Sequence, residues 1–436
     1  NLTLDSAIPL NSVTVDGTTN AKTLKLSVNS LNLKGDLTIK ATSVFNADSL
    51  TVSIGGNLTN LNTDANTGVT TGGYRPGSFR QVTKFIGSSA NQSITGTTGN
   101  ITNFAMLIIN NTYSNGTITM MANSAVRVNS DLSLLHGTLA DGGNIITVIG
   151  DITNSSTHSS TGTGRLLLAG SNVQYLSGDG TGKFGNLYLN ASSDVRMTSV
   201  MEITGVLTFQ GKILDIGNKL LVLSNTSATS VSGNSATSYI RTDGLVSDAG
   251  VMKYYPASAL DFTFPVGVLG KYTPARMNVT ANSAAGTITM IPVNSKHPCN
   301  TGTGTNLLTY YWHAVSSGFS GFTISQYYTY IQSDVRGTES TYVGDRFYLG
   351  IWDNPASGTV NTMTNVISFL SKTFIDGDYT AGQSTEFLIV PVFYSRNATC
   401  TAPLVGNWDN VTTWSTTSHS GAAATSYPTG EPVVIA

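Results

Sequence analysis

A block of sequence near residue 92 returns about 80 residues later with its turn residues in the same places. The matching pieces are 92–96, Phe104 and 107–110 in the first copy and 174–178, Phe184 and 187–190 in the second, and an earlier partial copy pairs 35–39 and 56–60 with 130–134 and 150–154. Each copy holds strand-like segments of a few residues, separated by Gly, Asn and Asp and with no helical pattern between them. Strands so short cannot bury an apolar face alone, so neighbouring copies have to stack on one continuous core.

The composition supports strands over helices. Only 11% of the 436 residues are charged, and Glu, a good helix former, occurs four times. Apolar residues make up 40% of the chain and alternate with Ser, Thr and Asn, as half-buried strands require. The sequence therefore predicts an ordered, all-β protein and excludes a mostly helical or disordered one.

Two architectures fit the repeats: a right-handed parallel β-solenoid, or a string of small β-sandwiches. The turns are built from Gly and Asn rather than from the Pro and aromatic corners of sandwiches, and stacked coils tolerate ladders of Asn and Thr. We expect the solenoid. At about 20 to 25 residues per coil and about 4.8 Å between coils, it would form a rod roughly 45 to 55 Å long.

The composition changes near residue 225. Only two of the twelve prolines precede it, whereas all four Trp, both Cys and 14 of the 18 Tyr follow it. The later part has clear period-2 strands: Phe322, Ile324 and Tyr328 share one face, and Thr323 and Ser325 the other. These features predict three parts: solenoid repeats at 1–225, an antiparallel β-sandwich at 226–398, and the start of a further β-repeat unit at 399–436.

Charge and hydropathy limit the partners. A net charge of −2 argues against a nucleic-acid partner, which needs clustered Lys and Arg. No apolar run approaches the roughly 18 to 20 residues of a spanning helix, so we expect no membrane insertion. The chain starts at Asn1 without a signal peptide, and we interpret it as an internal piece of a longer secreted precursor.

The two cysteines, Cys299 and Cys400, bracket most of the sandwich-like part. Joined, they would close a loop of about 100 residues, worth up to about 4.7 kcal/mol in the chain-entropy model. The alternative is two buried free thiols. An extracellular compartment favours the disulfide, and neither the spacing nor nearby His supports zinc.

Several stretches resemble the long, repeat-built secreted surface proteins of Bacteroidota, including the gliding-motility adhesins exported by type IX secretion. They are 174–178, 184–190, 205–213, 264–267, 272–274, 310–312, 350–352 and the tail at 406–415 and 427–435. The resemblance implies an extracellular location at the cell surface and a role in adhesion or matrix building. It carries no catalytic residues.

Candidate chemistry is sparse. The five His are scattered along the sequence. His313 lies in a strand-like segment, where we expect an ordinary hydrogen-bonded residue of the sheet and not a catalytic group. The run 376–378, Asp-Gly-Asp, has too few oxygen ligands for a calcium loop and fits a hairpin turn better. We therefore expect no cofactor and no metal site.

Because parallel solenoids also host polysaccharide-cleaving enzymes, acid pairs have to be considered. Asp131, Asp194 and Asp215 lie in separate turns with no second acid on the same strand. We expect a non-enzymatic protein. If the chain were an enzyme, Asp→Asn changes at these three positions should abolish activity.

Surface recognition leaves three candidate residues. Tyr327 points outward from its strand and could stack on a sugar ring, since an aromatic face offers flat apolar area. Ser6 and Ser49 stand in Asp-Ser-apolar contexts of the type that Bacteroidota modify with O-glycans.

Together these patterns predict a rigid β-rich stalk that displays binding surface. Its partners would be cell-surface or extracellular polysaccharide and neighbouring copies or domains of the same long protein. The principal alternative is a self-assembling filament or sheath subunit, which would pair solenoid ends or sandwich edges between copies.

Overall fold

The protein is nearly all β. A computed structural model describes residues 2–17, 19–64, 66–300, 302–353 and 357–387, and the short stretches 393–395, 414–416, 424–426, 428 and 433–434. About 2% of the chain is helical, in three single turns: η1 (Gln332–Asp334), η2 (Glu339–Thr341) and η3 (Ser384–Glu386). Nothing helical in this part of the chain is long and apolar enough to span a bilayer.

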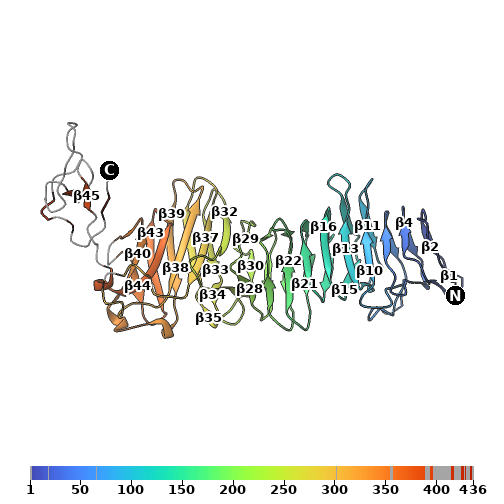
Figure 1. Ribbon diagram of the computed structural model, residues 1–436, viewed down its shortest axis with the longest axis horizontal. Helices are drawn as coiled ribbons and strands as arrows, with labels where there is room; N and C mark the ends of the chain where they lie inside the picture. The colour runs from blue at the N-terminus through green and yellow to red at the C-terminus, as the bar shows by residue number, and fades with distance from the viewer. Residues whose placement is uncertain are drawn as a thin grey trace.

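A β-solenoid of about 11 turns occupies the first part of the chain, which confirms the predicted fold class (Figure 1). Each turn contributes one strand to each of three faces, and strands on one face pair in parallel with the turns before and after. At about 4.8 Å per turn, the stack is roughly 50 Å long. We call this stack the rod.

The first face of the rod is a single sheet, parallel throughout except at its last strand. Its strands are β4 (Leu31–Leu33), β7 (Val52–Ile54), β10 (Val82–Phe85), β13 (Met106–Asn110), β16 (Leu132–His136), β19 (Ile152–Asn154), β22 (Gln174–Ser177), β25 (Val195–Met197), β28 (Leu214–Gly217), β31 (Ile240–Thr242), β34 (Val266–Val268) and the antiparallel β35 (Lys271–Tyr272).

The second face begins at β2 and runs the whole length of the rod. Its rod strands are β2 (Val13–Val15), β5 (Leu37–Ile39), β8 (Leu58–Asn60), β11 (Gln92–Thr95), β14 (Thr117–Met120), β17 (Thr138–Ala140), β20 (Thr157–Ser159), β23 (Lys183–Phe184), β26 (Met201–Ile203), β29 (Leu221–Leu223) and β32 (Val251–Tyr255).

The third face is divided into two sheets that meet where β9 contacts β12. The first contains β1 (Leu2–Leu4), β3 (Lys22–Leu26), β6 (Ser43–Asn46) and β9 (Tyr74–Arg75), and the second contains β12 (Ile101–Phe104), β15 (Ala125–Val128), β18 (Ile145–Val148), β21 (Arg165–Leu168), β24 (Leu187–Leu189), β27 (Leu207–Phe209) and β30 (Val231–Ser232).

The antiparallel part, which we call the head, is a two-sheet sandwich. One sheet prolongs the second face of the rod through β37 (Gly286–Val293), β38 (Tyr311–Ser317), β44 (Gly377–Gln383), β40 (Tyr342–Tyr348) and β41 (Ile351–Trp352). The other consists of β33 (Leu260–Phe264), β36 (Ala275–Ala281), β39 (Thr323–Thr329), β43 (Val366–Lys372) and β42 (Thr359–Asn361). Trp312, Tyr328 and Tyr379 make ring contacts between the two sheets. Farther along, β45 (Phe393–Ser395) pairs with β46 (Trp414–Ser415) and β47 (Val433–Val434).

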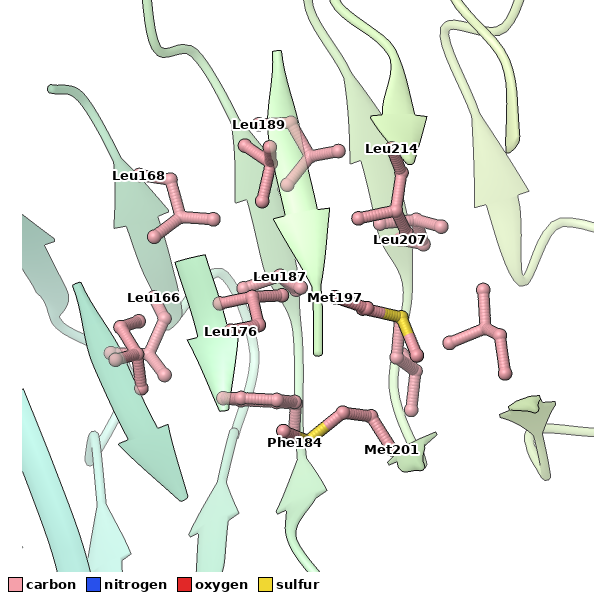
Figure 2. Close-up of a cluster of buried hydrophobic side chains, with 14 of the residues drawn as sticks. Leu166, Leu168, Leu176, Phe184, Leu187, Leu189, Met197, Met201, Leu207 and Leu214 are labelled. Carbon is pink, nitrogen blue, oxygen red and sulfur yellow. The ribbon is translucent and has the colours of Figure 1, made fainter. Parts of the chain in front are cut away.

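Apolar side chains stack in ladders inside the rod. Leu166, Leu187 and Leu207 occupy the same place on successive turns of the third face, and all three are buried. Figure 2 shows leucines, Phe184 and Met201 from all three faces pointing into one interior. Each turn thus covers the apolar edge of the turn before it, which is why three-residue strands suffice.

Asn and Asp side chains at the turns link one coil to the next. The Asp131 carboxylate accepts the Asp151 N–H at 2.9 Å, and the Asp151 carboxylate accepts the Tyr175 N–H at 2.8 Å. Asp36 caps the Asn57 N–H in the same way at 2.6 Å. Because these groups satisfy backbone donors where the ladder is interrupted, the many Asn and Asp residues have a structural use.

The repeated glutamines are buried and hold three backbone groups each. Gln174 accepts the Gly170 N–H and donates to the carbonyls of Val148 and Gly150. Gln92 accepts the N–H of 87 and donates to the carbonyls of 54 and 56. Both copies of the repeat therefore contain a buried glutamine that makes the same three hydrogen bonds to the backbone.

The repeat is not in register with the coil. Gln92 opens β11 on the second face, whereas Gln174 opens β22 on the first face, eleven strands later. Eleven strands at three per turn are three and two-thirds turns, so each copy is displaced by one face. The pairs β5 and β16, and β8 and β19, show the same step. The first and second faces are thus equivalent enough to host the same sequence.

The rod passes into the head without a break in its second face. β29 pairs in parallel with β32, and β32 then pairs antiparallel with β37. Parallel pairing continues to β34, beyond residue 225 where the composition predicts a domain boundary. One core cluster extends through the rod and between the sheets of the head.

Candidate functional site

Two hollows lie side by side on the head. The first encloses about 400 Å³ and is lined by Phe319, Phe322, Phe374 and neighbouring polar groups. The second encloses about 360 Å³. They share Tyr348 and Asp376, so together they form one continuous site at the ends of β38, β40 and β44. We call it the twin hollow.

A tight hairpin forms the rim of the second hollow. Leu349 and Gly350 join β40 to β41, and both have positive φ, +51° and +86°. Such a turn favours Asn-Gly, and a leucine in the left-handed region is strained. Leu349 is also 83% exposed, so no burial compensates for this strain. Strain of this kind is often kept at functional sites.

Two histidines share one carboxylate beside the second hollow. Asp378 accepts from His297 Nε2 at 3.0 Å and from His313 Nδ1 at 2.5 Å. Burial alone would raise the pKa of Asp378, but these two hydrogen bonds outweigh burial and the pKa is lowered. An ionised Asp378 requires Nδ1–H on His313, which leaves the other ring nitrogen, Nε2, free of this bond. The His313 side chain is 31% exposed and lines the hollow.

His297 is buried, and hydrogen bonds and aromatic rings hold its side chain in place. Its Nδ1 accepts the Cys299 N–H at 3.2 Å, and its ring contacts Tyr311, Phe347 and Trp352. With both nitrogens bonded, it orients Asp378 rather than facing solvent. His297 is thus a positioning residue for the carboxylate that His313 uses.

The loop that carries His297 is anchored by a buried glutamate. Glu386 accepts the N–H groups of Gly304 and Asn306 at 2.7 and 3.2 Å. Burial would raise the pKa of Glu386, but these backbone hydrogen bonds outweigh it and lower the pKa. Trp352 Nε1 donates to the Cys299 carbonyl at 2.8 Å. The loop is therefore held by its backbone, independently of any disulfide.

Arg346 lines the first hollow. Its Nε and Nη2 donate to the Asp353 carboxylate at 2.6 and 3.0 Å, and its guanidinium lies over Tyr348 and Phe374. A third donor bonds the Asp376 carbonyl at 3.1 Å. This bidentate pairing leaves Arg346 neutralised and holds the Tyr348 ring in place.

The residues predicted from sequence lie elsewhere. Tyr327 is partly exposed on the other sheet, with the Arg276 guanidinium 5.1 Å from its ring centre. Ser49 is exposed and Ser6 partly exposed on the rod. Cys299 is exposed, and because Cys400 lies outside the described residues, the disulfide stays a prediction.

The acids considered for polysaccharide cleavage have structural partners. Arg241 Nη2 bonds Asp215 at 2.7 Å, and Arg241 Nη1 lies 3.7 Å from Asp194. Stacking thus brings together two acids that sequence spacing keeps apart. Asp131 caps the next turn as described above.

The run 376–378 is not the hairpin turn that its sequence suggests. It joins β43 of one sheet to β44 of the other, and Asp378 lies within β44. Sequence analysis placed His313 correctly in a strand but missed its pairing with Asp378, because 65 residues separate them. Among the described residues, no group of three His, Cys, Asp or Glu is placed to hold a metal ion.

Comparison with known proteins adds no relative: no family model, curated protein or solved structure matches this chain. The architecture therefore defines the protein only as a β-solenoid joined to an antiparallel β-sandwich.

Proposed function

We propose that this chain is a non-enzymatic, rigid stalk segment of an extracellular surface protein, and that it holds the head away from the surface for adhesive contacts. The observation that carries the proposal is the continuous second face, which runs from β2 in the rod to β41 in the head. A sheet that crosses the junction leaves no flexible linker there. The fold is thus well suited to transmit position and force along its length.

The surface chemistry supports adhesion by many weak contacts. The charged fraction is only 11%, so contacts would depend little on ionic strength. The strength of such contacts grows with the number of linked copies, as in the repeat-built surface proteins that the sequence resembles. Polysaccharide is the partner that this neutral hydroxyl and amide surface favours, with Tyr327 as one candidate stacking position.

Electron microscopy of the purified chain tests the stalk. We expect single rods of uniform length, each with a head at one end and a narrow distribution of bend angles. Fibres would instead support the filament or sheath alternative, in which the edge strands pair between copies. A broad range of angles at the junction would contradict a rigid stalk.

Adhesion is tested with microspheres coated with the full chain. We expect them to attach to polysaccharide-coated glass more than albumin-coated spheres do, with little change between 50 and 500 mM salt. Equal attachment of the two sets of spheres would contradict an adhesive role. Release of reducing ends from the polysaccharide, lost in Asp→Asn variants at Asp131, Asp194 or Asp215, would contradict a non-enzymatic one.

A further inference from the structure

We infer that the twin hollow is a binding site for two consecutive sugar units of an uncharged polysaccharide, with Tyr348 as the stacking platform between them. This inference rests on the proposed adhesive function and names the ligand class that the head would take. Four features of the site support it.

The first is the pairing of aromatic surface with hydrogen-bonding atoms. Sugar rings have an apolar C–H face and a polar hydroxyl rim, so they bind where aromatic rings lie next to polar groups. Tyr348 is 36% exposed and Arg346 holds one side of its ring, 4.9 Å from the ring centre. Phe319, Phe322 and Phe374 give the first hollow a similar apolar wall.

The second feature is the set of polar groups prepared for hydroxyls. His313 lines the second hollow and has Nε2 available for a hydroxyl, because Asp378 takes up only its Nδ1–H. Asp376 uses one carboxylate oxygen for the Ser316 N–H, and it lines both hollows. Together these groups offer hydrogen-bonding atoms on both sides of Tyr348.

The third feature is charge balance, which favours an uncharged ligand. Arg346 is bonded to Asp353 on both arms of its guanidinium. Lys372, whose ammonium lies 5.8 Å from the Phe374 ring centre, is not among the residues that line either hollow. An anionic sugar would find no unpaired cation in the lining, and the carboxylates would repel it.

The fourth feature is the exposed, strained Leu349 at the rim. An apolar side chain that is 83% exposed and held at positive φ gains nothing from the folded chain itself. Contact with the C–H face of a bound sugar would bury it.

The size of the site agrees with this ligand. Two hollows of about 400 and 360 Å³ lie at the small end of the roughly 300 to 1,000 Å³ range of ligand sites, which suits one sugar unit each.

Affinity electrophoresis of the full chain tests this inference. Native gels would contain laminarin, xyloglucan, galactomannan or dextran as uncharged polymers, and alginate as the anionic one. We expect at least one uncharged polymer to retard the chain and alginate to have no effect. Retardation by alginate alone, or by no polymer, would overturn the inference while leaving the rods seen by microscopy untouched.

Variants locate the site. Tyr348→Ala should weaken retardation at least tenfold, Tyr348→Phe should keep most of it, and Asp376→Asn should weaken it about threefold. Tyr327→Ala is the matched control, since Tyr327 also lies beneath an arginine but on the other sheet. If Tyr327→Ala lost retardation and Tyr348→Ala kept it, the binding site would lie on the other sheet and the assignment would be overturned. Circular dichroism of each variant establishes that it is folded.

Discussion

The rod and the head use polar side chains in different ways. In the rod, the buried Gln and the capping Asp side chains mainly bond the backbone of the neighbouring turn, as Gln174 does, with a smaller number of ion pairs such as Arg241 with Asp215. In the head, polar groups bond one another: Asp378 joins two histidines, and Arg346 joins Asp353. The difference indicates that the rod is specialised for stacking, whereas the head carries ionisable groups next to an open site.

We expect the largest effect when one side chain of an apolar ladder in the rod is shortened. Leu187→Ala should destabilise the protein by about 3 to 4 kcal/mol, because the cavity lies between Leu166 and Leu207 and cannot collapse. The adjacent Tyr188→Ala is the control, since Tyr188 points outward, and it should cost under about 1 kcal/mol. Denaturant unfolding measures both. Similar values for the two would contradict a tightly packed rod.

The next effect tests whether the first and second faces are equivalent. Gln174→Met would leave one N–H and two carbonyls unsatisfied in a buried place and should cost about 2 to 3 kcal/mol. Gln92→Met, on a different face, should cost at least as much, because Gln92 makes the same three backbone bonds and also accepts from Asn111 Nδ2 at 3.1 Å. Gln210→Met is the control, because the Gln210 side chain accepts only from the exposed Tyr188 hydroxyl. A much lower cost for Gln92→Met than for Gln174→Met would limit the equivalence of the two faces to the backbone.

The repeat pattern was sufficient to predict the rod but not where it ends. Short strands have to stack on neighbouring copies to bury their apolar faces, and turns of Gly and Asn favoured the solenoid over a string of sandwiches, so the rod followed from local sequence. The end of parallel pairing depends on which edge β37 meets, a contact between distant segments. Tyr239 and Tyr255 already bring aromatic composition into the last turns of the rod, so the change in composition near 225 precedes the change in topology.

The site was less predictable than the fold for a related reason. Outward-facing residues of a strand follow from alternation, and Tyr327 was found that way. The twin hollow instead depends on Tyr348 at the end of one strand and on Asp378, which lies 81 residues from its partner His297. No local pattern encodes such pairings.

The third effect concerns acid stability of the head. Because the pKa of Asp378 is lowered in the folded state, its contribution is present above about pH 4 and is lost as pH falls through the depressed value. Asp378→Asn should cost about 2 kcal/mol at pH 7 and progressively less as the pH falls through the lowered pKa of Asp378. Hydrogen exchange in β38 and β44 measures this locally. A cost that does not change with pH would contradict an ionised Asp378.

The fourth effect lies where the rod meets the head, and here the substitution should stabilise the protein instead of destabilising it. Lys253 is buried, its ammonium bonds the carbonyls of Asn225 and Ser227, and burial lowers its pKa to about 8. Since the folded state releases this proton before the unfolded state does, stability should rise between pH 8 and about 10. Lys253→Met should remove that rise and stabilise the protein by about 1 kcal/mol at pH 7.

Lys25→Met is the control for the junction, because the Lys25 side chain is 47% exposed and pairs with Asp48 at the surface. Its thermal midpoint should stay within a degree or two of the parent at every pH. A rise in stability from pH 8 to 10 that persists in Lys253→Met would assign it to another group.

The smallest effect separates stability from function in the head. Leu349→Asn places a residue that tolerates positive φ in the hairpin at +51°, next to Gly350, and should stabilise the protein by about 0.5 to 1 kcal/mol. Since Leu349 is 83% exposed, no core packing is lost. A higher thermal midpoint together with weaker retardation by the uncharged polysaccharide would mean that the strain is maintained for binding. A higher midpoint with unchanged retardation would show that the hairpin contributes nothing to the site, and the stacking on Tyr348 would then have to account for the affinity alone.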